Sequence, residues 1–125
     1  MKFRLALLFF LLVSALKAQT RFDFTPTYRQ AHEAILGLQF KKAKTLLFQE
    51  RKNNPQNLIP FYLDNYIDFL TVLLSEEKPR FELLKKNKEI RLNLLEKGDK
   101  NSPFYLMTQA EINLQWAFVR IKFNE

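Results

Sequence analysis

The stretch 28–55 constrains the fold of this chain more than any other part of the sequence. It contains two runs of helical periodicity, separated by a short link at Gly37 and ended by Pro55. Apolar residues recur every three or four positions in each run, which is the spacing of one face of an α-helix. Proline cannot continue a helix, so the second run must end there. The stretch therefore predicts two antiparallel helices, the first capped by Thr25 with Pro26 at its first position.

The same stretch resembles a known family. Ala31, the pattern Phe40-x-x-Ala43, Leu47 and Pro55 fall at the offsets of one tetratricopeptide repeat, a unit with a period of about 34 residues. The resemblance implies antiparallel helical hairpins that stack into a right-handed solenoid, with small residues where the two helices touch. It covers this one unit, and the rest of the chain resembles the family only as helical hairpins.

Three positions of the unit depart from the family pattern. Ala34 stands where the family usually has a large aromatic residue, Glu50 where it prefers alanine, and Thr27 where it prefers tryptophan. The resemblance therefore supports a tetratricopeptide-like array and transfers no binding residue.

Residues 1–18 have the features of a secretory signal peptide. Two basic residues flank the start of an uninterrupted apolar run at 5–13, and Ala18 provides a small residue before a cleavage site. The run is shorter than the roughly 20 residues that a membrane-spanning helix needs. We expect export to the periplasm or cell envelope, with an uncleaved membrane anchor as the alternative, and a helical-repeat domain over residues 19–125.

Charge and composition limit the function classes. The chain has 20 basic and 13 acidic side chains; three of the basic ones lie in residues 1–18, which leaves 17 against 13, a net charge of +4. This mild excess argues against nucleic-acid binding and is compatible with weak contact with an anionic membrane surface. The chain has no cysteine, which excludes disulfides and thiolate metal sites, so its stability must come from an apolar core.

A third helix is expected to begin at position 58 or 60 and to end at Ser75. Its sequence is apolar almost all round, with Tyr62 and Tyr66 on one stripe and a narrow polar edge that includes Asp64 and Asp68. A helix with this pattern is surrounded by neighbours. We therefore expect it to be the interior helix of the stack.

Two further parts of the chain can be predicted from short sequence features. A fourth helix is expected over 79–97, followed by Gly98 in the left-handed conformation that often ends a helix. Residues 19–24 are expected to form a loosely held lead-in, with Phe22 and Phe24 packing back onto the first hairpin.

The last helix, which opens at Ser102-Pro103, has two apolar faces. We expect one face to dock on the preceding helices and the other to find no partner within the chain, whereas the end of a solenoid normally has a polar outer face. Either the chain is the front part of a longer protein, which we favour, or Trp116 and Phe123 meet a partner. The stretch 116–123 also resembles the opening region of long exported helical-repeat proteins of Gram-negative bacteria. The first face consists of Met107, Ala110, Leu114, Ala117 and Ile121, and the second face consists of Ile112, Trp116, Val119 and Phe123.

No catalytic, cofactor or metal site is predicted. His32 is the only histidine; with Glu33 it begins a zinc-protease motif, but the second histidine would stand at position 36, which is Leu36. Asp64 and Asp68 are one turn apart and share a helical face. A hydrogen-bonded polar edge is the favoured interpretation, and reception of a basic group from a partner is the alternative.

The sequence thus predicts an all-α protein of about five helices that is not an enzyme and that docks a protein partner on its concave surface. Further helical repeats of the same chain are the other expected partner. The alternative function is a helical module of a larger exported enzyme or of a membrane-associated protein. Apolar contacts would provide affinity and the two aspartates orientation, and the expected binding residues are Asp64, Asp68, Tyr62, Tyr66, Trp116 and Phe123.

Overall fold

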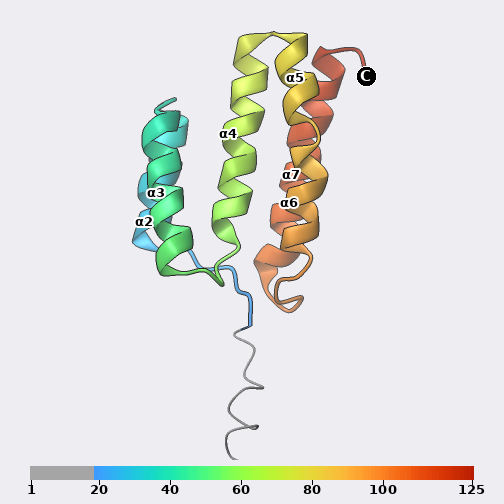
Figure 1. Ribbon diagram of the computed structural model, residues 1–125. Coiled ribbons are helices and arrows are strands. Elements are labelled where there is room, and N and C mark those ends of the chain that lie inside the picture. Colours follow the sequence, from blue (N-terminus) through green and yellow to red (C-terminus); the bar gives the residue numbers. More distant parts are fainter. Residues whose placement is uncertain (1–18) are drawn as a thin grey trace, which may run out of the picture.

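The computed structural model describes residues 19–125, and the regular elements of this part are helices, which confirms the all-α prediction (Figure 1). The expected signal peptide at 1–18 lies outside the described residues. The helices are α2 (Pro26–Leu36), α3 (Phe40–Asn53), α4 (Ile59–Ser75), α5 (Lys78–Leu84), α6 (Asn87–Leu95) and α7 (Pro103–Lys122).

Local sequence explains where the helices begin. The Thr25 hydroxyl oxygen accepts a hydrogen bond of 3.3 Å from the Tyr28 amide, which caps α2, and Pro26 occupies the first helical position. In the same way, the Ser102 hydroxyl oxygen accepts from the Phe104 amide at 3.3 Å at the start of α7. Among the described residues, none of the helices is both long enough and apolar enough to cross a membrane.

The fourth predicted helix is interrupted. It divides into α5 and α6 at Lys85 and Lys86, whose φ, ψ angles of −57°, −30° and −64°, −24° are close to those of a 3₁₀ turn. The Lys88 amide bonds to the Lys85 carbonyl three residues back, at 3.3 Å. This local tightening separates two segments that follow each other end to end (Figure 1).

Gly98 does not have the left-handed conformation that was expected of it, since no glycine of the described residues has a positive φ. The position requires glycine for another reason. A Cβ atom there would lie 2.5 Å from Cε2 of Phe22 and 2.9 Å from Cδ1 of Leu58. The close approach of the lead-in segment to the end of α6 therefore leaves no room for a side chain.

The lead-in at 19–24 is held firmly, contrary to expectation. The Arg21 amide donates to the Gln56 carbonyl, and the Arg21 carbonyl accepts from the Leu58 amide, both at 2.9 Å. Phe24 packs on Tyr28 of the first hairpin, as expected, whereas Phe22 packs against Gly98 instead. The segment thus joins the α3–α4 connection to the α6–α7 connection at the same end of the helices (Figure 1).

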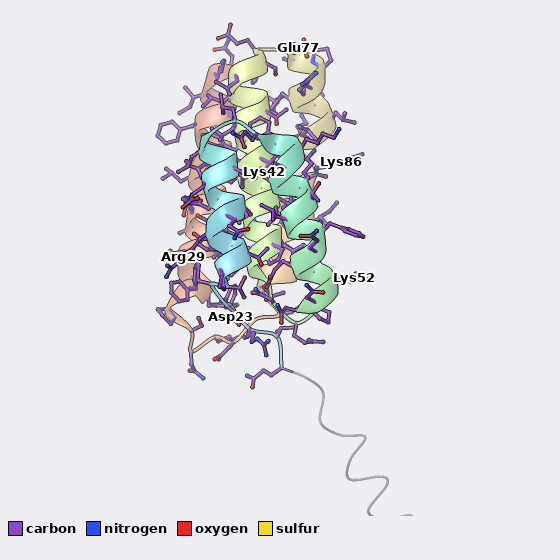
Figure 2. All side chains as sticks on the ribbon, turned by 90° about the vertical axis from the view of Figure 1, so that its left-hand side faces the viewer. Asp23, Arg29, Lys42, Lys52, Glu77 and Lys86 are labelled. Carbon is purple, nitrogen blue, oxygen red and sulfur yellow. The ribbon has the colours of Figure 1, made fainter. Side chains whose placement is uncertain are left out.

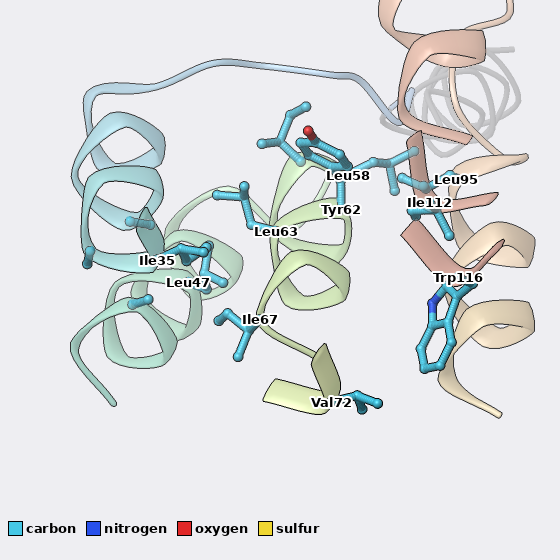
Figure 3. Packing of buried hydrophobic residues seen from close by; sticks show 14 of the residues in the cluster. Ile35, Leu47, Leu58, Tyr62, Leu63, Ile67, Val72, Leu95, Ile112 and Trp116 are labelled. Atoms are coloured by element: carbon cyan, nitrogen blue, oxygen red, sulfur yellow. The ribbon is translucent and has the colours of Figure 1, made fainter. Parts of the chain in front are cut away.

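Helix α4 lies in the middle, with α2 and α3 on one side and α6 and α7 on the other (Figure 1). Figure 3 shows that the core has two parts, one on each side of α4. Because both sides of α4 are covered, its nearly all-apolar sequence is explained, and the prediction of an interior helix is confirmed. The outer face of the α2–α3 pair carries charged side chains such as Arg29, Lys42 and Lys52 (Figure 2).

Candidate functional site

Five aromatic side chains form a row that runs from the lead-in across α2 to α4, which we call the aromatic row. Successive ring centroids are 4.6 Å apart from Phe24 to Tyr28, 5.7 Å to His32, 6.0 Å to Tyr66 and 6.1 Å to Phe69. All five side chains are half-buried, so the row keeps part of its surface open to solvent. Such a surface can bind apolar or aromatic groups with little loss of side-chain freedom.

The spacing of these residues explains why they meet. Tyr28 and His32 are four residues apart on α2, and Tyr66 and Phe69 are three apart on α4, so each pair lies on one side of its helix. The neighbouring positions Ala31 and Ile35 are fully buried and bring α2 onto the rest of the core. The small alanine allows the close approach that places His32 beside Tyr66.

A tyrosine–glutamate pair lies next to the row. The Tyr62 hydroxyl donates a hydrogen bond of 2.6 Å to Glu111 Oε2, which links α4 to α7. Burial, together with this bond and the Glu111 charge, raises the pKa of Tyr62 well above its usual value. Burial and the same carboxylate also raise the pKa of Tyr28. Tyr62 is only 5% exposed, so it holds the helices together instead of offering a free surface.

Tyr62→Phe is expected to make the protein less sensitive to alkaline pH. An unfolded tyrosine has a pKa of about 10, and the pKa of folded Tyr62 is higher. The contribution of Tyr62 is therefore fully present below about pH 10 and is lost as the pH rises through the folded pKa. Urea unfolding of both proteins from about pH 8 to 11 measures this. The difference between the two curves should be constant below about pH 10 and shrink above it; parallel curves throughout would contradict the prediction.

The two aspartates of α4 do not join the aromatic row. Asp64 Oδ2 accepts a 2.5 Å hydrogen bond from Arg51 of α3, and Asp68 Oδ2 lies 2.7 Å from Arg91 of α6. Tyr66 follows Asp64 by two residues, about 200° around a helix with 3.6 residues per turn, so it faces the opposite side. The expected combination of aspartates and tyrosines in one groove is therefore not formed.

Both carboxylates are engaged within the chain. Asp68 also accepts a hydrogen bond of 2.8 Å from Asn87 Nδ2. Burial raises the pKa of Asp64 in spite of the opposing effect of the Arg51 and Arg91 charges. The favoured interpretation from sequence, a hydrogen-bonded polar edge, agrees with this arrangement, in which the basic groups come from α3 and α6.

The covered and the open face of α7 are the reverse of those predicted from the sequence. Trp116 is 1% exposed, and Phe123 stacks on the buried Phe81 with a centroid distance of 4.9 Å. Both therefore lie on the covered face, and their assignment to the open face was wrong. The open face is the one with Leu114 and Ile121, which are 57% and 72% exposed.

Two buried polar clusters were missed by sequence reasoning. Asn65 Nδ2 donates to Gln115 Oε1 at 2.7 Å, and Trp116 Nε1 donates to Asn65 Oδ1 at 2.8 Å, which joins α4 to α7. Glu50 Oε1 accepts from Asn57 Nδ2 at 3.1 Å, beneath the lead-in. A signal for the second cluster was present, because Glu50 is a departure from the repeat pattern.

The described residues contain no group of three or more histidine, cysteine, aspartate or glutamate side chains arranged to hold a metal ion. Comparison of the chain with protein-family models, with curated proteins and with solved structures found no significant match.

Proposed function

We propose that this protein is a non-catalytic interaction scaffold of the bacterial cell envelope, exported by its residues 1–18. Its helices would form a tetratricopeptide-like array, and the aromatic row would bind an apolar segment of a partner protein. The observation that carries the proposal is the row itself: half-buried rings from α2 and α4 held in register by packed helices.

The order of helix packing supports the array. Helix α4 packs on both members of the α2–α3 pair, and α7 packs on both α4 and α6. The first helix after each hairpin thus contacts both helices of that hairpin, as expected for a repeat protein in which each unit packs on the preceding one. In this scheme α2, α4 and α7 are equivalent first helices, and the aromatic row spans two of them.

The chemistry of the row indicates the kind of partner. Partly exposed aromatic rings favour apolar and aromatic side chains of a peptide, since such pairs add about 0.5–1.5 kcal/mol beyond burial of area. Glu111, close to Tyr28 and Tyr62, adds a carboxylate on the same side. Orientation of the partner would therefore come from Glu111, in place of Asp64 and Asp68.

Selection from a displayed random-peptide library tests this function. Peptides enriched on the wild-type protein should bind Tyr66→Ala about tenfold more weakly, because loss of one ring pair is worth about one factor of ten. Phe61→Ala is the matched control, since Phe61 is a half-buried aromatic residue of the same helix that lies over Arg51 on the other side. Absence of enriched peptides, or equal losses in both variants at unchanged helix content, would contradict the proposal.

A further inference from the structure

Helix α7 has an uncovered apolar face along most of its length. We call it the α7 stripe and define it by Met107, Ala110, Leu114, Phe118 and Ile121. Among these, Leu114 and Phe118 are both 57% exposed, and Ile121 is 72% exposed. A continuous exposed apolar surface of this kind marks an interaction site, and its helical spacing fits another helix.

The spacing of the stripe is symmetric. From Met107 to Ile121 the steps along the sequence are 3, 4, 4 and 3 residues, with Leu114 at the centre. A helix with such a pattern looks the same when its direction is reversed. It can therefore pair with a second copy of itself in the antiparallel direction, across a two-fold axis that passes beside Leu114.

We propose that two copies of this chain associate through antiparallel packing of their α7 stripes. In this register Leu114 meets the same residue of the second copy, Ala110 meets Phe118, and Met107 meets Ile121. A small residue thus faces a large one at two places, as interdigitated helix packing requires. The inference does not depend on the proposed peptide-binding function, which uses the aromatic row.

Charge favours the same arrangement. The stripe contains no charged residue, and residues 103–110 carry no charge on any face of the helix. In the antiparallel pair, the exposed Arg120 at the carboxyl end of one α7 lies beside this uncharged half of the other, so the two arginines do not oppose each other, and Lys122 is already bonded to Glu76 of its own chain. The helix dipoles also run in opposite directions, which is the favourable order for neighbouring helices.

Sedimentation equilibrium of the full chain, expressed with its own residues 1–18, tests the association. The wild type is expected to be a dimer, and Leu114→Glu should weaken it at least about 100-fold, because two like charges then meet in an apolar contact. Leu83→Glu is the matched control: Leu83 is 61% exposed on α5, outside the stripe, and its replacement should leave the dimer unchanged. A monomeric wild type at the highest soluble concentration, or equal weakening by both variants, would overturn the proposal.

Single cysteines determine the direction of packing, since the chain has none of its own. Leu114→Cys should form a disulfide-linked dimer on mild oxidation. Met107→Cys alone should not, because its two copies would be about 21 Å apart at 1.5 Å per residue, far beyond the reach of a disulfide. Met107→Cys mixed with Ile121→Cys should cross-link again.

The opposite cross-linking result also has a definite meaning. Efficient linking of Met107→Cys to itself, in addition to that of Leu114→Cys, would indicate parallel packing, in which every position meets its own copy, and would overturn the proposed register. A Leu114→Cys protein that stays monomeric and reacts freely with a maleimide would leave the stripe open for a helix of a different chain or of a further repeat, and would equally overturn self-association.

Discussion

Replacement of Asp68 by alanine is expected to lower the free energy of unfolding by about 3–5 kcal/mol. Arg91 Nη1 lies 2.7 Å from Asp68 Oδ2 as an ion pair without an aligned hydrogen bond, and the two side chains are 13% and 11% exposed. Removal of the carboxylate leaves Arg91 charged, nearly buried and without its counter-ion, which is the costly way to break such a pair. Urea titration followed by circular dichroism measures the loss.

Asp64→Ala is the matched control, since it removes the same side chain one turn earlier on α4. Its partner Arg51 is 32% exposed and Asp64 itself 22%, so water can screen the charge that remains. The expected loss is about 1 kcal/mol or less. Equal losses for the two aspartates would show that burial does not decide the effect.

A double replacement separates the ion pair from the packing. Asp68→Leu combined with Arg91→Met removes both charges and keeps apolar volume, so it should recover a large part of the stability lost in Asp68→Ala. A double variant as unstable as the single one would contradict the explanation by an unpaired charge.

Asn65→Ala is expected to lower the free energy of unfolding by about 3 kcal/mol. Asn65 is fully buried, accepts from Trp116 Nε1 at 2.8 Å and donates to Gln115 Oε1 at 2.7 Å. Alanine leaves both partners buried and unsatisfied, at about 1–3 kcal/mol each. Urea unfolding followed by the fluorescence of Trp116, the only tryptophan, reports on the contact directly.

Asn113→Ala is the control for this prediction, because Asn113 is an exposed asparagine of α7 that bonds to the Gln109 carbonyl within its own helix. It should change stability by no more than about 0.5 kcal/mol. A variant with Asn65→Leu, Gln115→Leu and Trp116→Phe together should be more stable than Asn65→Ala, since no polar partner is then left without a bond. Failure of that rescue would contradict the role assigned to the buried amide network.

Helix boundaries were predictable where a local cap or stop is present. Thr25 and Ser102 each accept a hydrogen bond from an amide of the first helical turn, and Pro26 and Pro103 follow them, as the sequence indicated. Such signals act over three or four residues, so they do not depend on the rest of the fold. The break between α5 and α6 has no glycine or proline to mark it, and the sequence analysis therefore missed it.

The candidate site was predictable only in part. Tyr66 was named as a binding residue and lies in the aromatic row beside Phe69 of the same helix, but Tyr28 and His32 join it only because α2 packs beside α4. Asp64 was correctly predicted to lie on a hydrogen-bonded polar edge of its helix. Its partner Arg51 was not predicted, because it lies thirteen positions away on a different helix. Contacts of this kind depend on the angle and depth at which helices pack, which periodicity does not specify.

The sequence by itself determined that this chain is helical, where most of its helices start and stop, and that α4 is covered on both sides. These features follow from local hydrogen bonding and from the period of the apolar residues. Only the tertiary structure decided which of the two apolar faces of α7 is covered. Both faces have helical spacing, so spacing alone does not distinguish them. The covered face is the one on which Trp116 donates a hydrogen bond to the buried Asn65 and Phe123 stacks on Phe81. Trp116 and Asn65 are fifty-one positions apart in the sequence, so only the packed chain brings this buried polar group to its hydrogen-bond partner.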